Sequence, residues 1–544
     1  MELNVLLRGQ SNAGLLQRSP DFGTIATDAE KLLGFDGVNN KINLLEKDSD
    51  TAANDNTVVG GTAFIGDWIS AVNGNWRNGW TNNTLETGLL NYIDALPAAE
   101  KAAPTAILWL QNENDSTNAS LSTQQWMSGV NFEAQQVRQA LGQSAATTPY
   151  VFVNAIPFGE NLIPAVNQGI KQGMELLAAN PAFNATVGAQ ANDVNMDYGQ
   201  TGTYGGPHMD VTDSNMVDLR LARSIAMEFK QYALPGSAVA AGTVDAYGPE
   251  AVAARLVGTT QVEVTMALNN AALSATLSSA AASGVGWSIT DNGTTLNATA
   301  ATVTDSGHVL LTFATAVPTD AAATLYYTYG YGRLATSDTS PGQNNAVYDQ
   351  QGMPIWGPAS GLHINVAGIT GSYSEQNLTT GASATLAGTV SSMPSYQSEF
   401  VAIGPDTVQV TANTPNAFMV AGQGQDVLMA TSGNNLLNAD QNTALMIGGS
   451  GSDHFVIDSR GPSTWDALAN FHSGDALVIW GPTLGASQLT WSETAGNQAV
   501  LTISGGGISS AGVGFVNTTA AQAQAFAIGG GTAGGMNYLT ISHV

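Results

Sequence analysis

The sequence predicts a multidomain chain with three successive units: an α/β unit over residues 1–235, an all-β sandwich over residues 240–365, and a parallel β-roll with further strands over residues 366–544. Three observations predict this order. The first unit alternates apolar strand-like runs with helical patterns, the second loses helical periodicity, and the third repeats every nine residues. A chain of 544 residues is also too long for one core, since domains usually hold ~100–200 residues.

In the first unit, the clearest strands are continuous apolar runs, as expected of strands that are buried on both faces. We expect strands at 3–7, 105–110, 149–155 and, more weakly, 186–191. Helical patterns lie between and after them, at 84–96, 123–141, 162–180 and 215–232. This alternation predicts a parallel sheet with helices on both faces.

The second unit contains short β segments at 260–267, 308–313 and 324–329, separated by turn signals such as Asp291-Asn292-Gly293. This pattern predicts a sandwich of the immunoglobulin or fibronectin type.

The third unit carries a nonapeptide ladder, in which one register position is apolar in every rung. The residues at that position are Val410, Met419, Leu428, Leu437, Met446 and Phe455. The segment 448–456 (GGSGSDHFV) fits the pattern G-G-x-G-x-D-x-U-x completely. The register predicts that residues eighteen apart stack on the same side of the roll.

The amino-acid composition argues against several classes of partner and site. The net charge of −27 argues against nucleic acid as a partner, because its binding needs a basic surface. The absence of cysteine excludes disulfides and thiolate metal sites. No apolar run reaches the ~18 residues of a membrane span, so none is expected. Residues 231–544 contain no lysine, which is typical of extracellular proteins. Met1 leads directly into a strand pattern, so we expect no N-terminal signal peptide.

Three segments of the first unit carry candidate chemistry. Ser11, in Gly9-Gln10-Ser11-Asn12, follows the first strand, and active sites of open α/β sheets form at that edge. A serine nucleophile needs a base, and His208 is the sole histidine of residues 1–235. Residues 111–115 (QNEND) follow the second strand with amides suited to an oxyanion. Each segment taken alone also fits an ordinary turn or cap.

Together these segments resemble the SGNH (GDSL-type) hydrolases, most closely their carbohydrate acetylesterase branch, with blocks G-Q-S-N, E-x-G (86–88), Q-x-E-x-D and a late histidine. The resemblance implies a flavodoxin-like three-layer fold and an esterase that needs no catalytic cofactor. Ser11 would be the nucleophile, and His208 the base and then the acid. The Ser11 N–H, the Gly88 N–H and the Asn114 side chain would form the oxyanion hole.

Two departures from that family concern the third and fourth blocks. Asn112 stands where the family has glycine, and glycines stand at 205 and 206, where it has an orienting aspartate. Asp197, Asp210 or a backbone carbonyl remain alternatives for holding the imidazole.

The ladder is similar to the RTX repeats of proteins exported by type I secretion, which implies structural calcium, an uncleaved C-terminal signal, the type I secretion machinery as a partner and an extracellular location. In such a roll, calcium is bound by loop carbonyls and by carboxylates at the Asp position. The candidate ligands are Asp453, in the best site, with Gly449, Gly451, Asn435 and Asp426. Because some rungs of the ladder lack an aspartate at the Asp position, we expect one or two calcium sites, and these should bind weakly. A β-solenoid without metal is the alternative.

The predicted function is that of a secreted serine esterase that removes acetyl or other small acyl groups from a polysaccharide through an acyl-enzyme on Ser11. Trp68, Trp76 and Trp80 either stack on sugar rings or belong to a core. Two alternatives remain: an RTX-type scaffold or adhesin with a degenerate hydrolase domain, and a lipase-like esterase acting on esters without sugar. The early position of Ser11 disfavours an α/β-hydrolase, and the single histidine disfavours a metallohydrolase.

Overall fold

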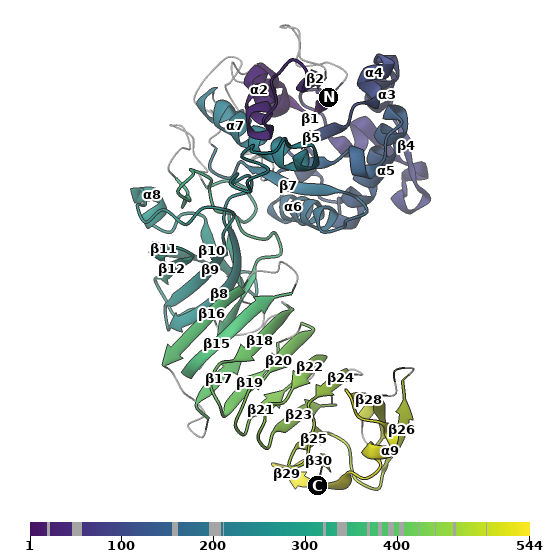
Figure 1. Cartoon of the computed structure of the whole chain (residues 1–544), viewed down its shortest axis with the longest axis vertical. Coiled ribbons are helices and arrows are strands. Elements are labelled where there is room, and N and C mark those ends of the chain that lie inside the picture. Colours follow the sequence, from purple (N-terminus) through teal and green to yellow (C-terminus); the bar gives the residue numbers. More distant parts are fainter. Residues whose placement is uncertain are drawn as a thin grey trace.

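The computed structural model describes the chain except for residues 19–21, 46–56, 155–161, 195–207, 210, 319–322, 335–344, 367–369, 379–382, 390–395, 402–406, 423, 441, 461–463, 495, 497, 507 and 544. Strands far outnumber helices in the described part. Figure 1 shows an elongated molecule, with most helices gathered at the N-terminal end and strands stacked from there to the C-terminus.

The N-terminal unit contains a five-stranded parallel sheet in the order β2-β1-β5-β6-β7. Its strands are β1 (Glu2–Gly9), β2 (Lys41–Leu45), β5 (Thr105–Leu110), β6 (Tyr150–Asn154) and β7 (Ala185–Gln190). Alternate side chains enter two cores, because successive residues of a strand point to opposite faces. Leu7 packs in one core with helices α1 (Ser11–Arg18), α2 (Phe22–Leu33) and α7 (Val211–Glu228), while Leu6 packs in the other with α3 (Thr84–Ala95), α5 (Thr123–Leu141) and α6 (Pro164–Ala178).

The strands and helices expected along this unit lie within a few residues of the predicted ranges. The stretch between α2 and α3 contains a small antiparallel pair, β3 (Ile69–Ala71) with β4 (Trp80–Asn82), beside a short π-helical turn at Phe64–Trp68. A short helix, α4 (Ala98–Ala102), leads into β5. None of the helices in the described ranges combines the length and apolar character that crossing a membrane requires.

The middle unit is a closed barrel with strand order β10-β11-β12-β9-β8-β14-β13. Its strands are β8 (Glu250–Gly258), β9 (Gln261–Ala267), β10 (Trp287–Asp291), β11 (Thr294–Asp305), β12 (His308–Phe313), β13 (Thr324–Tyr327) and β14 (Leu362–Val366), with the short helix α8 (Ser279–Ala282) between β9 and β10. The predicted sandwich is therefore wrong. Pairing of β13 with both β10 and β14, and of β14 with β8, joins the two edges of the sheet. Alternating sequence patterns predict strands but not this closure, which removes the exposed edges.

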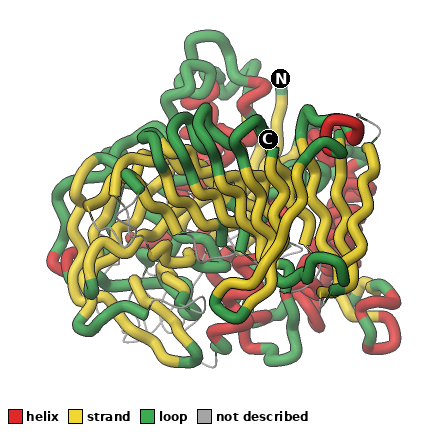
Figure 2. The backbone as a smooth tube through the Cα atoms, turned by 90° about the horizontal axis from the view of Figure 1, so that it is seen from below, coloured by secondary structure: helices red, strands yellow, loops and turns green. Residues whose placement is uncertain are grey.

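The following strands form two facing sheets that the chain visits alternately (Figure 2). One contains β15 (Thr370–Asn377), β16 (Ser383–Thr389), β18 (Val408–Ala412), β20 (Asp426–Met429), β22 (Ala444–Ile447) and β24 (Thr464–Ala469). The other contains β17 (Ser398–Val401), β19 (Ala417–Val420), β21 (Leu436–Asn438), β23 (His454–Asp458) and β25 (Ala476–Trp480). We call residues 408–480 the ladder unit.

The ladder unit confirms the predicted register. Parallel partners from β18 to β23 lie eighteen residues apart, as in Val410 with Leu428 and Met419 with Leu437, whereas β24 and β25 pair with residues twenty-two positions earlier, as in Leu445 with Ala467. The six apolar residues of the repeat are all fully buried. Antiparallel strands continue the two sheets toward the C-terminus: β26 (Ser487–Glu493), β27 (Ala499–Gly505), β28 (Ile508–Phe515), β29 (Ala527–Ala533) and β30 (Met536–Ser542), with the short helix α9 (Ala520–Ala523).

The fold class predicted for the whole chain is wrong. The molecule is mainly β, with a seven-stranded closed barrel and long stacked sheets, and the α/β arrangement is confined to its N-terminal end. We therefore describe the chain as a mainly β molecule and drop the three-layer SGNH, flavodoxin-like class and the sandwich. The prediction gave too much weight to the clear helical periodicity of the N-terminal unit, whereas strands make up most of the remaining chain.

Buried polar contacts join the N-terminal unit to the barrel. Arg220 on α7 forms a bidentate ion pair with Asp193, with N–O distances of 2.7 and 2.8 Å, and the Tyr348 hydroxyl donates to Asp193 at 2.6 Å. On α6, the Asn167 amide donates to the Gly330 carbonyl and the Lys171 ammonium to the Thr328 carbonyl. These contacts fix the two units against each other.

Candidate active site

A tight turn places Ser11 at the junction of β1 and α1. Gly9 pairs with Leu110 at the end of β5. A Cβ atom at position 9 would collide with the Leu110 carbonyl and with Ala13, so only glycine fits there. Ser11 is half-buried and is the first residue of α1. The N-terminus of a helix carries partial positive charge and unpaired N–H groups, which suit a developing negative charge.

The side chains on either side of Ser11 connect it to two other loops. The Gln10 amide oxygen accepts hydrogen bonds from the Asn114 N–H at 3.3 Å and from the Gln111 amide at 3.4 Å. The Asn12 amide donates to the Glu113 carboxylate at 2.9 Å, and its oxygen accepts from the Met209 N–H at 3.1 Å. Gln10 and Asn12 therefore hold residues 111–114 and the segment that contains His208 around Ser11.

His208 precedes Met209, whose N–H is bound by the buried Asn12 side chain. This contact brings the chain at His208 to the residue next to Ser11, although 197 positions separate Asn12 from Met209. His208 is half-buried. The alternatives for its orienting acid, Asp197 and Asp210, lie outside the described residues.

The two other predicted oxyanion donors differ in their placement. Asn114 is joined to Gln10 through its backbone N–H. Gly88 lies on α3, whose residue Glu86 faces Arg8 at 3.7 Å. In the described part of the chain, no hydrogen bond connects Gly88 with Ser11 or Asn114. Asn112, which replaces the family's glycine, is accommodated as a buried residue, and its N–H donates to the Glu113 carboxylate at 3.0 Å.

Two carboxyl groups behind the turn are buried, those of Glu113 and Asp115, and the sequence placed both in a candidate block without giving either a role. Burial raises the pKa of Glu113 to about 7, although the Asn12 amide stabilises its ionised form. Burial likewise raises the pKa of Asp115 to about 7, while the N–H groups of Phe64 and Ile65 bind its carboxylate at 2.8 and 2.9 Å. Asp115 thereby fixes the loop at residues 64–65 against the site.

These raised pKa values predict that the protein is more stable in mild acid than in mild alkali. The unfolded carboxyls ionise near pH ~4, whereas the buried groups keep their protons to about pH 7. The unfolded state therefore binds fewer protons in this window, and stability falls as pH rises from ~4 through ~7. We expect urea denaturation to give a higher free energy of unfolding at about pH 5.5 than at about pH 8.5. Glu113→Gln should flatten this slope, and a protein more stable at the higher pH would contradict the prediction.

A cluster of buried charged side chains lies beneath β1. In the sequence, the one indication of this cluster was Arg8, which stands in a mainly apolar strand. Arg8 is fully buried, with Glu86 at 3.7 Å and Glu133 at 3.6 Å from its guanidinium. Its charged carbon lies 3.5 Å from the centroid of the Trp68 ring. The Tyr150 hydroxyl donates to Glu133 at 2.8 Å. This cluster supports the strand that carries the Ser11 turn.

The tryptophans considered as a sugar platform belong mainly to the core of this unit. Trp68 is fully buried under Arg8, and Trp80 is buried with its indole N–H donating to Ser128 at 3.1 Å. Trp76 is partly buried against the same core. The core interpretation therefore holds for Trp68 and Trp80.

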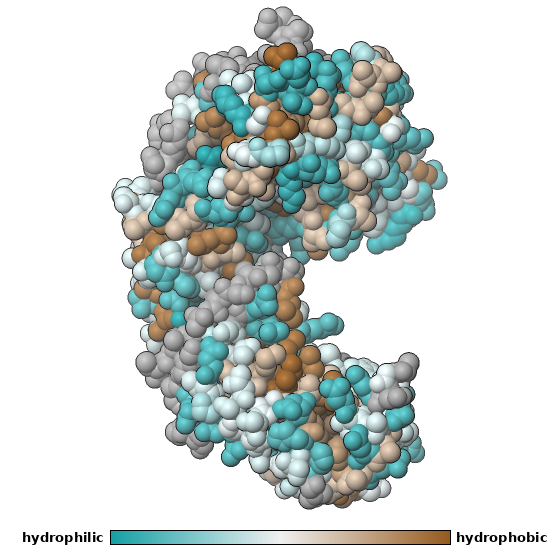
Figure 3. All heavy atoms as spheres, viewed as in Figure 1, coloured by the Kyte–Doolittle hydropathy of each residue, from teal (hydrophilic) through white to brown (hydrophobic). Residues whose placement is uncertain are grey.

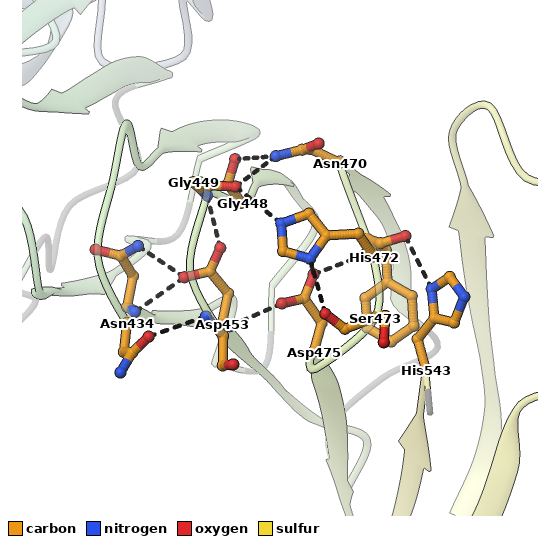
Figure 4. Close-up of polar contacts among 12 residues, drawn as sticks. Asn434, Gly448, Gly449, Asp453, Asn470, His472, Ser473, Asp475 and His543 are labelled. Atoms are coloured by element: carbon orange, nitrogen blue, oxygen red, sulfur yellow. Dashed lines mark hydrogen bonds and ion pairs between the residues drawn. The ribbon is translucent and has the colours of Figure 1, made fainter.

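The candidate calcium ligands of the ladder unit have hydrogen-bonded partners within the chain (Figure 4). The Asp453 carboxylate accepts from the Gly449 N–H at 2.6 Å and from the Asn435 backbone N–H and side-chain amide at 2.9 and 2.7 Å. Asp426 accepts from the N–H groups of Val408 and Gly422. As predicted, Asn435 stacks on Asp453, and Asp426 pairs with Ala444.

Close packing between stacked turns requires the glycines of the ladder unit, whether or not a metal ion is bound. A Cβ atom on Gly451 would collide with the Gly433 carbonyl of the stacked turn, and one on Gly449 would lie 2.9 Å from the Ser432 nitrogen. Within the described ranges, no group of three or more histidine, aspartate or glutamate side chains is arranged to hold a metal ion.

Comparisons with known proteins leave the chain without an assigned family. No family model matches it, and no curated protein matches it. Among solved structures, the crystal structure of the S-layer protein rSbsC(31-844) is similar at 13% sequence identity and a TM-score of 0.16. That match covers 51% of this chain and 35% of the S-layer chain, so it spans about a third of the S-layer chain's length.

Proposed function

We propose that the chain is a serine esterase with Ser11 as nucleophile and His208 as base. The observation that carries the proposal is the pair of hydrogen bonds made by Asn12, which link the residue beside Ser11 to both Glu113 and Met209. This arrangement joins three segments that each carry one part of acyl-transfer chemistry: a hydroxyl, an imidazole and amide donors.

In the proposed reaction, Ser11 Oγ attacks the acyl carbon and His208 takes its proton. The tetrahedral oxyanion is stabilised by the Ser11 N–H at the start of α1 and by an Asn114 donor. His208 gives the proton to the departing alcohol, which leaves an acyl-Ser11 intermediate. Water, deprotonated by His208, then attacks the acyl carbon, and His208 returns that proton to Ser11 Oγ as the acid is released. Atoms and protons balance without a cofactor.

We further propose acetyl or other small acyl groups on a polysaccharide as the substrate class, on the resemblance of the Gly9–Asn12 and 111–115 blocks to carbohydrate acetylesterases. The test measures acetate release from acetylated xylan, pectin and chitin, with p-nitrophenyl acetate as a general ester. Turnover of p-nitrophenyl acetate without acetate release from any polysaccharide would favour the lipase-like alternative. Failure on every ester would favour the scaffold or adhesin.

We also propose that the ladder unit binds calcium outside the cell, after export by a type I system. The support is the nonapeptide 448–456, whose Gly449 N–H holds the Asp453 carboxylate at 2.6 Å. An ion there would exchange N–H partners of the Asp453 carboxylate for metal coordination. Calcium bound there through oxygen ligands would stabilise the folded chain, because it binds the folded state in preference to the unfolded state.

The calcium proposal predicts a melting temperature that rises with millimolar calcium and returns on chelation. Asp453→Asn should abolish most of this rise, because its amide carries no charge for the ion. Glu493→Gln, in the C-terminal strand β26, is the matched control and should keep it. An unchanged melting temperature on adding calcium would mean that hydrogen bonds and the apolar stack alone hold the ladder unit.

A further inference from the structure

A cavity of about 610 Å³ lies between the N-terminal unit and the barrel, apart from Ser11. Helix α6 forms one wall, and strands β8 and β14 with the loop around Trp356 form the others. The Glu175 carboxylate on α6 accepts the Ala359 N–H at 2.9 and 3.0 Å, which fixes that loop against the helix. Figure 3 shows a deep hollow in the molecule between the N-terminal unit and the ladder unit, and α6 lies on the side of its unit that faces this hollow in Figure 1.

Two carboxyl groups line this cavity together with His363, and the charge of Lys171 on α6 attracts the Glu175 carboxylate. Glu175 and Glu250 come from different units and repel each other. No lysine or arginine belongs to the described lining. Lys171, one turn earlier on α6, directs its ammonium to the Thr328 carbonyl at 3.2 Å. Burial raises the pKa of Glu175 to about 8 and that of Glu250 to about 7.

Glu250 differs from Glu175 in having no partner. It is half-buried at the start of β8, and in the described part of the chain its carboxylate makes no hydrogen bond or ion pair. Burial raises its pKa. A buried carboxylate without a partner costs free energy, and a ligand that supplied a positive charge or a donor would recover it.

The rest of the lining is apolar or aromatic. Leu176 and Leu268, which are 47% and 43% exposed, contribute apolar surface to the lining. Trp356 and Tyr247 add aromatic surface, which attracts cations as well as apolar groups. A pocket of several hundred Å³ with apolar walls and a few polar groups is typical of small-molecule sites.

We propose that this cavity binds a small organic cation, in which a protonated amine or quaternary ammonium faces Glu250 and Glu175 and an apolar body lies against Leu176, Leu268 and Trp356. The site is independent of the proposed ester hydrolysis, since Ser11 and His208 are not part of its lining.

The test uses the full chain and two probes of the same shape, benzylamine and benzyl alcohol, of which the first alone is cationic near pH 7.5. Calorimetric titration should show benzylamine binding at least ~10-fold more tightly, a difference of about 1.4 kcal/mol. Glu250→Gln should remove this preference. Glu2→Gln, which neutralises a surface carboxylate at the start of β1, is the matched control and should keep it.

Leu268→Lys provides a second variant at an exposed position, so that loss of folding does not decide the result. Its ammonium should compete with benzylamine and weaken binding at least ~10-fold. Turnover of p-nitrophenyl acetate, measured in parallel, should be unchanged in both cavity variants. Equal binding of the two probes, no binding of either, or a preference that survives Glu250→Gln would each overturn the proposal, whatever the esterase assay gives.

Discussion

Replacing Ser11 by alanine is expected to lower kcat/KM for p-nitrophenyl acetate at least ~10³-fold, because no other group at the end of β1 would replace its hydroxyl as nucleophile. His208→Ala should cause a loss of similar size. The double variant should be little worse than either single variant, since residues that act as one unit are strongly non-additive. Steady-state kinetics with the purified chain would measure all three.

Asn12→Ala tests whether Asn12 positions the catalytic segments without taking part in the reaction itself. It removes both the bond to Glu113 and the acceptor for the Met209 N–H, so kcat should fall while Ser11 remains able to react slowly. Ser116→Ala, whose hydroxyl donates to the Glu113 carbonyl, is a control from the same region and should keep most activity. A Ser11→Ala protein that retains near wild-type turnover would disprove the mechanism.

The largest expected effect on stability follows from Arg8→Met. Methionine fills a similar volume but leaves Glu86 and Glu133 buried without a cation. Breaking a buried ion pair from one side usually costs ~3–5 kcal/mol, so we expect a loss of this order in the free energy of unfolding. Burial, together with repulsion from Glu133, already raises the pKa of Glu86 to about 8, so the loss should be smaller in mild acid. Urea denaturation at two pH values would measure both effects.

A compensated variant separates charge from packing at the same site. Adding Glu86→Gln and Glu133→Gln to Arg8→Met removes the unpaired charges and keeps an acceptor for the Tyr150 hydroxyl. We expect the triple variant to recover most of the lost stability. A loss below ~1 kcal/mol for Arg8→Met alone would show that the cluster does not stabilise the fold.

Local patterns predicted the elements better than the way in which they combine. The run 105–110 is a buried strand because every residue in it is apolar or small enough for a core, and its position follows from the sequence alone. The barrel depends instead on the parallel pairing of Ile364 with Ala254, across more than a hundred residues. No local pattern encodes such a partner, so the sandwich prediction failed and the class of the chain was wrong.

The same distinction applies to the candidate site. Ser11, His208 and Asn114 were chosen as residue types that suit acyl transfer, and that reasoning could not show which side chains connect them. Asn12 does so through its two hydrogen bonds. Arg8 was missed and Glu113 was given no role because burial, rather than residue type, makes them significant, and burial of a charged side chain contradicts its usual preference for water.

The buried hydrogen bonds from backbone N–H groups to side chains in the ladder unit run toward the C-terminus, whereas exposed ones run back: the N–H groups of Asn434 and Ser452 donate to side chains eighteen positions earlier. The N–H groups of Val408, Ala417 and Asn435 each donate to a side chain eighteen positions later, and Asp453 donates to Asp475 in the same sense. The buried N–H groups of a turn therefore depend on the turn that follows it. Removing rungs from the C-terminal side strips acceptors from these buried N–H groups, whereas removing them from the other side frees side-chain acceptors that water can solvate. Truncation from the C-terminal side is therefore expected to destabilise the remaining stack more than truncation of the same length from the other side.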